Sequence, residues 1–535
     1  MTVRLFTARS VSYQQTGYFS RLVTDYLNGN TFLKNFYTHP VSLEGIESAI
    51  ENRERFHTNR VLLSEILEKQ YESLSVPAPL KKNLSFLKDK NAFTITTAHQ
   101  PAIFTGNLYF IYKIIHVIKI AETLSAKYPD KHFVPVYYMG SEDADIDELG
   151  YIYLNNEKIV WDTRQTGAVG RMSNSGLEKI IARIEGEFAG FPFGQELVSL
   201  LKDCYSAGDT IQQATLKLLT RLFGEFGLVV LIPDSAGLKA CMKSVFTDDL
   251  IDHTPFKITR KNVESLSTEY DVQANPREIN LFYLKDDIRE RIEKIEDHYQ
   301  VLKTNIRFTR DEILRELEDF PDRFSPNVIL RGLFQETILP NIAFIGGGGE
   351  TAYWLELKPL FEQYKVPYPV LILRNSFLII NKKWKAKIEK AGLTEEVFFL
   401  PEEKIVDAQV RRESQHLLSL DNQIESQRQF YASLKEIVGA IDKTLVQHVN
   451  SLEIQSLNKL EELEKKMVRA EKKNHTDVQL KIHEIHSALF PLENLQERIE
   501  NFIPWYASYG AEFLNLIYQY SNSMEQSFTI LSEKS

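Results

Sequence analysis

The sequence predicts an α/β protein with a Rossmann-like parallel-sheet core, inserted segments and an α-helical antiparallel coiled-coil domain. Two strand–helix–strand patterns occur far apart, at residues 91–139 and 341–373. Between them lie mixed helical and irregular segments, at about 155–225 and 240–325. From about residue 386 the strand signals stop, and the chain becomes rich in Glu, Lys, Gln and Leu. These changes of pattern predict the division into a sheet-based core and a helical domain.

The first pattern follows a mostly helical stretch at 17–90. NAFTITTA, at 91–98, is a short β-branched run that suits a buried strand. HFVPVYYM, at 132–139, predicts a second one. Between them, 107–128 has the spacing of an amphipathic helix, with apolar side chains at Leu108, Ile111, Ile115, Ile118 and Leu124. A strand, a helix and a strand in this order predict parallel pairing with a right-handed crossover.

The second pattern repeats this order late in the core. NIAFI, at 341–345, leads into GGGG, at 346–349, then into the helical ETAYWLELKPLFEQY and the strand PVLIL, at 369–373. GLVVLIPDS, at 227–235, predicts one more strand. The sheet is therefore built from segments that are distant in sequence, as in open α/β folds.

The helical region contains a seam of heptad type. Residues 452–473 are nearly free of Gly and Pro, and 474–476 interrupt them. Apolar residues then recur at Val478, Ile482, Ile485, Leu489 and Leu492. Two helices joined at 474–476 would form an antiparallel hairpin, although a solvated helical arm without a partner is the alternative. The predicted parts are a core at 1–385, a coiled-coil domain at 386–505 and a C-terminal helix returning to the core at 506–535.

Composition limits the classes of partner. The formal net charge of −10 argues against a general nucleic-acid or anionic-membrane surface. No apolar run approaches the length of a membrane span, and the first residues lack the apolar segment of a secretory signal. Cys204 and Cys241 are the only cysteines, which excludes a disulfide framework and a CxxC motif. We expect a cytoplasmic protein that binds neither nucleic acid nor membrane.

The first candidate binding loop is HQPAIFTGN, directly after the first strand. Ligands of open parallel sheets bind beyond the carboxyl ends of the strands. Backbone amides at the start of the next helix would attract an anion. A lone histidine is more often structural, and capping of the helix is the alternative for the Thr and Asn. The candidate substrate-binding residues here are His99, Gln100, Thr105, Gly106, Asn107 and Lys113.

The second candidate is the acidic loop SEDADIDELG, at 141–150. Five carboxylates within seven positions repel one another unless they are solvated or meet cations. They could recognise a substrate amine, or Mg²⁺ if a nucleotide is used, while a solvated acidic loop is the alternative. The spacing does not fit an EF-hand, and no residue is assigned as a metal ligand. The candidate catalytic residues are Glu142, Asp143 and Asp145.

The third candidate is the glycine loop with its neighbours. IGGGGETAYW lacks the Lys-Ser or Lys-Thr of a P-loop and the spacing of a dinucleotide-binding loop, but its glycines would allow positive φ angles and close approach of a ligand. ILRGLFQETILP, just upstream, places three polar residues on one helical face, and an arginine at the end of PVLIL could clamp a carboxylate. The candidates are Gly347, Gly349, Glu350, Tyr353, Trp354, Arg331, Gln335, Glu336 and Arg374.

These motifs occur in an order that resembles a known family. TTAHQPAIFTGNLYFIYKII, PVYYMGSEDADIDEL, SPNVILRGLFQETILPNIAFIGGGGETAYWLELKPLF and LFPLENLQERIENFIPWYASYG follow one another along nearly the whole chain. Together they resemble the cysteine ligase family of bacillithiol biosynthesis, whose members add cysteine to glucosaminyl-malate. The match rests on order and spacing, not on a single motif.

The resemblance implies a Rossmann-like core with connecting-peptide insertions, an active-site canyon and a coiled-coil domain that forms a homodimer. It implies an amide bond between the cysteine carboxyl and the glucosamine amine. Because a carboxylate is a poor acyl donor, we expect ATP, with Mg²⁺, to activate it. The malate carboxylates would meet Arg331 or Arg374, and the acidic loop around Glu142 and Asp143 would hold an amine, assisted by Asp145.

The sequence departs from the pattern of that family at three places. The family more often has Gly-Gln-Gln at 98–100, where this chain has Ala-His-Gln. It often has Glu-Asp-His-Asp at 142–145, where Ala144 replaces the histidine, and proline where Gly348 stands. Histidine acid–base catalysis in the acidic loop is therefore not expected, and His99 is expected to position a ligand.

Two other functions stay open at the level of the sequence. One is a nucleotidyl- or aminoacyl-transferase acting on another acceptor, which the absence of HxGH and KMSKS weakens. The other is a dimeric binding protein with a catalytically silent core, which the charged groups at three strand ends weaken.

Overall fold

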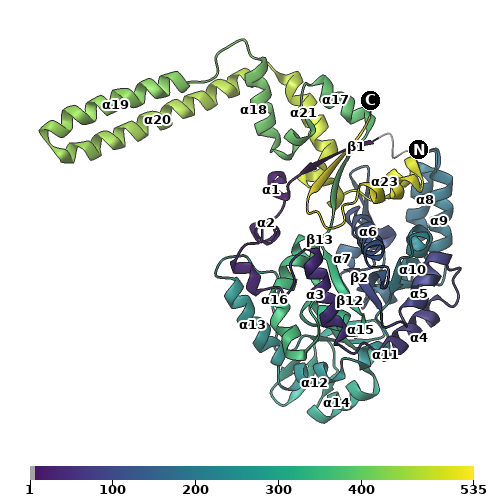
Figure 1. The fold of residues 1–535 in the computed structure, drawn as a ribbon. Coiled ribbons are helices and arrows are strands. Elements are labelled where there is room, and N and C mark those ends of the chain that lie inside the picture. The colour runs from purple at the N-terminus through teal and green to yellow at the C-terminus, as the bar shows by residue number, and fades with distance from the viewer. Residues whose placement is uncertain (1–5, 535) are drawn as a thin grey trace. The chain divides into compact units, whose positions relative to one another are not determined.

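The computed structural model describes residues 6–534, which form two compact units (Figure 1). One unit comprises 6–379 together with 494–534, and the other comprises 380–493. Across the residues described, no helix is both long enough and apolar enough to cross a membrane.

A five-stranded sheet, parallel throughout, lies at the centre of the first unit. The predicted strands are confirmed, in the order β13 (Val370–Leu373), β12 (Asn341–Gly346), β2 (Ala92–His99), β3 (His132–Met139) and β6 (Val229–Leu231). From β2 the chain builds the sheet outward through β3 and β6, and it later adds β12 and β13 on the opposite side. Such a reversal of strand order opens a crevice beyond the carboxyl ends of the two central strands, here β2 and β12.

Helices cover both faces of this sheet. On one face the strands pack against α3 (Leu43–Glu54) and α6 (Tyr109–Lys127) through side chains such as Ile345. On the other face they pack against α15 (Val328–Ile338) and α16 (Gly348–Tyr364). Burial on both faces explains why the strands read as continuous apolar runs. This packing also holds α6, α15 and α16 in place, and each of these helices has one end near the crevice.

Further helices and a hairpin surround the core. The N-terminal stretch is mostly helical as predicted, with α1 (Tyr13–Thr16), α2 (Arg21–Leu27), α4 (Arg60–Tyr71) and α5 (Ala78–Phe86) in addition to α3. The short helix α7 (Ile146–Leu149) follows β3. The first insertion contains β4 (Tyr151–Leu154), β5 (Glu157–Val160), α8 (Leu177–Phe188), α9 (Gly194–Cys204) and α10 (Ile211–Phe223).

The second insertion is predicted to be mixed helical and irregular, but the structure also contains a β-sheet there. It has the helices α11 (Ala236–Ala240), α12 (Lys243–Ile251), α13 (Thr254–Leu266) and α14 (Arg310–Asp319). It also has an antiparallel sheet of β7 (Leu281–Lys285), β8 (Ile288–Ile295), β9 (His298–Val301), β10 (Arg307–Phe308) and β11 (Phe324–Pro326). Five of the eight residues of β8, IRERIEKI, are charged, and most of its side chains are half-buried or exposed. It therefore lacks the apolar face that marks a strand in a sequence.

The two ends of the described chain meet in a third sheet. β15 (Phe528–Glu533) pairs antiparallel with β1 (Phe6–Val11) and lies next to β14 (Ser376–Ile380). The expectation that strands stop near residue 386 is therefore wrong. The sequence does not reveal β15 because the strand pairs with β1, more than 500 residues away. Before it come α22 (Ile503–Tyr509) and α23 (Glu512–Tyr520), and α23 packs on α6.

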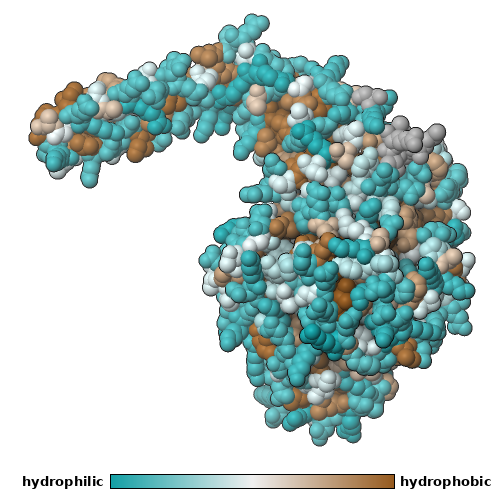
Figure 2. All heavy atoms as spheres, viewed as in Figure 1, coloured by the Kyte–Doolittle hydropathy of each residue, from teal (hydrophilic) through white to brown (hydrophobic). Residues whose placement is uncertain are grey.

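The second unit is entirely helical. Its elements are α17 (Lys382–Lys390), α18 (Glu402–Glu413), α19 (Asp421–Ile441), α20 (Lys443–Lys472) and α21 (Thr476–Leu489). The long antiparallel hairpin is α19–α20, so its turn lies at Asp442 and not at 474–476 as predicted. The apolar seam of α21 packs against α18 instead. No Gly or Pro marks the true turn, where Asp442 caps α20 by accepting from the Thr444 N–H at 2.8 Å. Figure 2 shows hydrophobic residues among the polar ones along this hairpin.

Candidate functional site

A cavity of about 740 Å³ lies at the reversal of strand order. Its wall includes residues that directly follow β2, β3 and β12. The structure therefore brings the three predicted loops together. The predicted residues that line the cavity are His99, Gln100, Asp143, Arg331, Gly347, Gly349, Glu350, Tyr353 and Arg374.

Positive charge dominates the cavity wall. Three carboxylates line it, those of Asp143, Glu148 and Glu350. Six guanidinium groups line it, and they belong to Arg277, Arg289, Arg291, Arg331, Arg374 and Arg498. Like charges around one cavity repel one another, and a bound anion relieves that repulsion. The site is suited to a ligand with several negative charges.

Asp143 is the best-paired carboxylate of the cavity. It accepts a hydrogen bond from Gln100 Nε2 at 3.0 Å, and Arg331 Nη1 lies 3.3 Å from the same oxygen. Arg289 Nη1 lies 3.5 Å from the other oxygen. Burial alone would raise the pKa of Asp143, but Arg331 and Arg289 hold it well below its usual range. Asp143 therefore stays ionised and orders this side of the wall.

The other two predicted catalytic residues do not line the cavity. Glu142 is buried and forms an ion pair with Lys239, which also lies 3.0 Å from Asp234. Burial raises the pKa of Glu142, and Lys239 opposes this shift. Asp145 is exposed and caps α7 by accepting from the Glu148 N–H at 3.2 Å. Glu142 thus lies in a buried ion-pair network, and Asp145 acts on the helix that carries Glu148.

His99 lies in the cavity wall as a neutral ring. Its Nδ1 is 2.8 Å from the Gln100 carbonyl, which can only accept, so Nδ1 carries the proton. Its Nε2 then accepts from the Tyr109 hydroxyl at 3.0 Å. Burial lowers the pKa of His99 to about 4. His99 therefore positions Tyr109, whose oxygen keeps a free lone pair.

The turn that follows His99 and Gln100 forms hydrogen bonds with other parts of the protein and does not face the cavity. The side chain of Asn107 donates to the Arg498 carbonyl at 2.6 Å, and the Leu108 N–H donates to the Glu500 carbonyl at 2.8 Å. Thr105 and Gly106 adopt positive φ angles of 67° and 63°. None of these residues lines the cavity, and no side chain caps α6. The predicted amide cradle is therefore absent from this turn, which instead anchors the segment carrying Arg498.

The glycine loop lines the cavity without unusual backbone angles. None of its four glycines has positive φ, unlike the expectation from the sequence. Glu350 accepts from the Gly347 N–H at 2.8 Å and pairs with Lys113 at 2.6 Å. Lys113 is 1% exposed and also donates to the Ala98 carbonyl, so it lies behind the wall and supports it.

Three predicted residues point into the interior. Glu336 pairs with Arg53 at 2.8 Å and accepts from the side chain of Gln335 at 2.9 Å. This network lies at the start of β12, where Asn341 also donates to Glu336. Since α15 rises about 1.5 Å per residue, Arg331 reaches the cavity while Gln335 and Glu336 lie a turn further away. Trp354 packs on Phe344 within the core.

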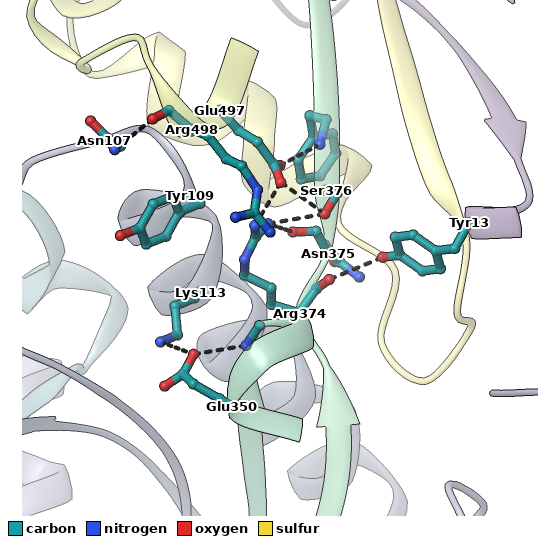
Figure 3. Close-up of polar contacts among 12 residues, drawn as sticks. Tyr13, Asn107, Tyr109, Lys113, Glu350, Arg374, Asn375, Ser376, Glu497 and Arg498 are labelled. Atoms are coloured by element: carbon teal, nitrogen blue, oxygen red, sulfur yellow. Dashed lines mark hydrogen bonds and ion pairs between the residues drawn. The ribbon is translucent and has the colours of Figure 1, made fainter. Parts of the chain in front are cut away.

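Arg374 joins the cavity to the C-terminal segment (Figure 3). Its guanidinium donates to Glu497 at 2.6 Å and to Ser376 Oγ at 2.9 Å. It also lies 5.2 Å from the centre of the Tyr109 ring. The next residue after Glu497 is Arg498, whose exposed side chain lines the same cavity.

Comparison with known proteins identifies the family. A model described as the Bacillithiol biosynthesis BshC N-terminal Rossmann-like domain matches residues 6–375. A second model, the BshC C-terminal coiled-coil domain, matches 377–533. The chain belongs to the BshC family.

BshC relatives align over nearly the whole chain. The protein of Flavobacterium johnsoniae is 39% identical over 98% of this chain and 99% of its own length. Those of Flavobacterium psychrophilum and Christiangramia forsetii are each 37% identical, over 97% and 98% of this chain and 98% of their own lengths. All three carry the name "Putative cysteine ligase BshC".

Sequence reasoning missed part of the cavity of this BshC member. Missed residues include Tyr109, Glu148, Arg277, Arg289, Arg291 and Arg498. One signal was available, because Arg289 and Arg291 are two residues apart and therefore share a face of a strand. This spacing indicates a shared face only if β8 is known to be a strand, and its sequence does not show that.

Proposed function

We propose that this protein is a cysteine ligase of bacillithiol biosynthesis, which joins the carboxyl of L-cysteine to the amine of glucosaminyl-malate. The observation that carries the proposal is the arginine-rich cavity at the carboxyl ends of β2 and β12. Among the described residues, no carboxylate pairs with the guanidinium of Arg277, Arg291 or Arg498. A dicarboxylate such as the malate group would supply the missing negative charge. The name of the BshC relatives, putative cysteine ligase, supports the ligation of cysteine.

The charges of the wall suggest an orientation for glucosaminyl-malate. Arg374 and Arg498 both reach the region beside Tyr109 (Figure 3). We place the malate carboxylates there, where guanidinium groups can bind each carboxylate with two hydrogen bonds. The amine then faces Asp143 and Glu148 across the cavity.

Glu148 is the group we assign as proton acceptor. Asp143 is paired with arginines and Glu350 with Lys113, whereas within residues 6–534 no cation pairs with Glu148. Partial desolvation at the cavity wall raises the pKa of Glu148, and Asp145 and Asp143 add to this effect. A raised pKa makes a carboxylate a better base near neutral pH.

Amide formation requires activation of the cysteine carboxyl. ATP with Mg²⁺ would supply it by converting the carboxylate into an adenylate, with release of pyrophosphate, or into an acyl phosphate, with release of ADP. Attack of the amine nitrogen on that carbon forms the C–N bond, AMP or phosphate leaves, and the proton of the nitrogen passes to Glu148. Arg277 and Arg291 remain to hold phosphate oxygens.

The test is an assay of purified protein with glucosaminyl-malate, L-cysteine and ATP. We expect mass spectrometry to detect the coupled thiol with wild-type protein and at least 100-fold less with Arg331→Ala, because that change leaves Asp143 without its closest cation. Arg315→Ala, an exposed arginine on α14, is the matched control. Absence of product with ATP and with other nucleotides would contradict the proposal, and full activity of Arg331→Ala would contradict the site.

A further inference from the structure

One wall of the cavity is a loop without helix or strand. It spans 271–280, between α13 and β7. Five of its residues line the cavity: Gln273, Asn275, Arg277, Ile279 and Asn280. A loop of this kind costs conformational entropy to fix in one shape. Its position therefore depends on what holds its two ends.

Glu356 holds the beginning of the loop. This residue of α16 is 0% exposed. Its two carboxylate oxygens accept from the N–H groups of Gln273, at 2.7 Å, and Ala274, at 2.9 Å. No cation within the described part of the chain pairs with it, and burial raises its pKa to about 7.

Asp249 holds the end of the loop in the same way. This residue of α12 is also 0% exposed. Its oxygens accept from the Asn280 N–H at 2.6 Å and from Asn280 Nδ2 at 2.9 Å. It has no cationic partner in the described chain, and burial raises its pKa to about 7.

Asn280 passes this constraint to Arg277. Its Nδ2 donates to the Arg277 carbonyl at 2.8 Å, and its Oδ1 accepts from the Arg277 N–H at 3.2 Å. Oδ1 also accepts from Asn327 Nδ2 at 3.1 Å. Because Asp249 occupies the other donor positions of Asn280, the amide can take only one orientation. Asn280 thereby holds both the N–H and the carbonyl group of Arg277.

We infer that Asp249 and Glu356 are positioning residues that hold Arg277 at the cavity wall, where its guanidinium meets the anionic part of the small-molecule substrate. Burial of two carboxylates without cations is costly, and a loop with no task could be held by neutral groups. Arg277 is the cationic side chain that the loop brings to the wall, and it has no ion-pair partner among residues 6–534. The identity of the anion, glucosaminyl-malate or the nucleotide, rests on the proposed function.

Amide hydrogen exchange of the full-length protein tests the positioning role without any ligand. Asp249→Asn should raise exchange in the peptides covering Arg277 and Asn280 about tenfold or more, because an amide in place of the carboxylate loses one acceptor. Glu356→Gln should do so at Gln273 and Ala274. Asp252→Asn and Glu362→Gln, exposed residues at the end of α12 and on α16, are the matched controls. Unchanged exchange in folded variants of both kinds would overturn the inference.

A double-mutant cycle tests whether Asp249 acts through Arg277. Calorimetric titration measures the affinities for glucosaminyl-malate and, separately, for ATP. We expect Arg277→Ala to weaken one of these two affinities about 10- to 100-fold. Asp249→Asn should weaken the same affinity about 10-fold, and the double variant should bind no more weakly than Arg277→Ala alone. Arg277→Lys should recover part of the loss. Fully additive losses would contradict the positioning role. If wild-type protein binds neither compound, the proposed function fails, while the exchange comparison still decides the positioning role.

Discussion

Arg374 and Glu497 form an ion pair of 2.6 Å in which both side chains are buried, 4% and 0% exposed. The pair joins the end of β13 to a residue 123 positions later, in the segment that follows the helical unit. Glu497 also accepts from Ser376 Oγ and from the Phe377 N–H. These contacts fix the segment in which the next residue, Arg498, reaches the cavity. The ion pair thus supports the fold and positions a cationic residue of the candidate site.

Removal of this charge should destabilise the protein. Glu497→Gln leaves Arg374 buried without a counter-charge, so we expect the free energy of unfolding to fall by about 3 kcal/mol. Urea denaturation measures it. Glu525→Gln, an exposed change in the same C-terminal segment, should cost less than about 0.5 kcal/mol. Equal stability of the two variants would show that the pair contributes little.

Arg498→Ala should affect binding and not stability. The side chain is exposed and has no ion-pair partner in the described chain. Loss of a charge-assisted hydrogen bond should weaken glucosaminyl-malate binding about 10- to 100-fold. Calorimetry measures the affinity, with Arg315→Ala as control. An unchanged affinity would place the carboxylates elsewhere in the cavity.

Glu148 should govern the acidic limb of the pH–rate profile. Its raised pKa predicts that activity falls, as pH decreases, at a value above the ordinary glutamate pKa of 4.5. Glu148→Gln should lower kcat about 100-fold or more and abolish that limb. Asp145→Asn removes a neighbouring negative charge and should move the limb to lower pH without its loss. A limb that persists in Glu148→Gln would assign the proton acceptor to another group.

Glu356 should make stability depend on pH. Burial raises its folded-state pKa to about 7 from an ordinary value of 4.5. The folded protein then binds the proton more tightly than the unfolded chain, so this contribution to stability is present below about pH 4.5 and is lost as pH rises to about 7. The loss should be on the order of 3 kcal/mol. Urea denaturation at pH 5 and pH 8 should show a smaller pH effect for Glu356→Gln than for Glu362→Gln, and an equal effect would contradict the assignment.

The α19–α20 hairpin should form the homodimer interface. Phe430, Ile437 and Ile441 are 53%, 59% and 77% exposed, and their spacing of seven and four places them on one helical face. Light scattering should give a dimer for wild-type protein and a monomer for Ile437→Glu with Ile441→Glu. Gln429→Glu, on the same helix, should stay dimeric. A dimer that survives the double change would contradict this interface.

The parallel sheet could be read from the sequence because its strands are short apolar runs bounded by glycine or polar residues. β8 and β15 could not, since β8 is highly charged and β15 depends on β1 at the other end of the chain. The hairpin turn at Asp442 contains neither Gly nor Pro, and its only local signal is the single N-cap aspartate within a long charged helical segment.

The site was predictable where it follows the strands directly. His99 ends β2, Gly347 and Arg374 directly follow β12 and β13, and Asp143 lies four residues after β3, so topology alone brings them together. Arg277 and Arg498 reach the cavity because long-range contacts hold residues near them in the chain. Asp249 holds Asn280 and Arg374 holds Glu497, and no local pattern reveals either contact. Glu142 is adjacent to Asp143, yet it points into a buried network, because neighbouring side chains beyond a strand face different directions.

We expect the arginine-lined cavity to bind glucosaminyl-malate for coupling to cysteine. A crystal structure of the protein with glucosaminyl-malate tests it most directly. We predict the compound in the cavity at the reversal of strand order, with its carboxylates within hydrogen-bond distance of Arg374 or Arg498 and its amine facing Glu148. Glucosaminyl-malate bound at another surface, or a cavity without it at saturating concentration, would contradict this binding mode.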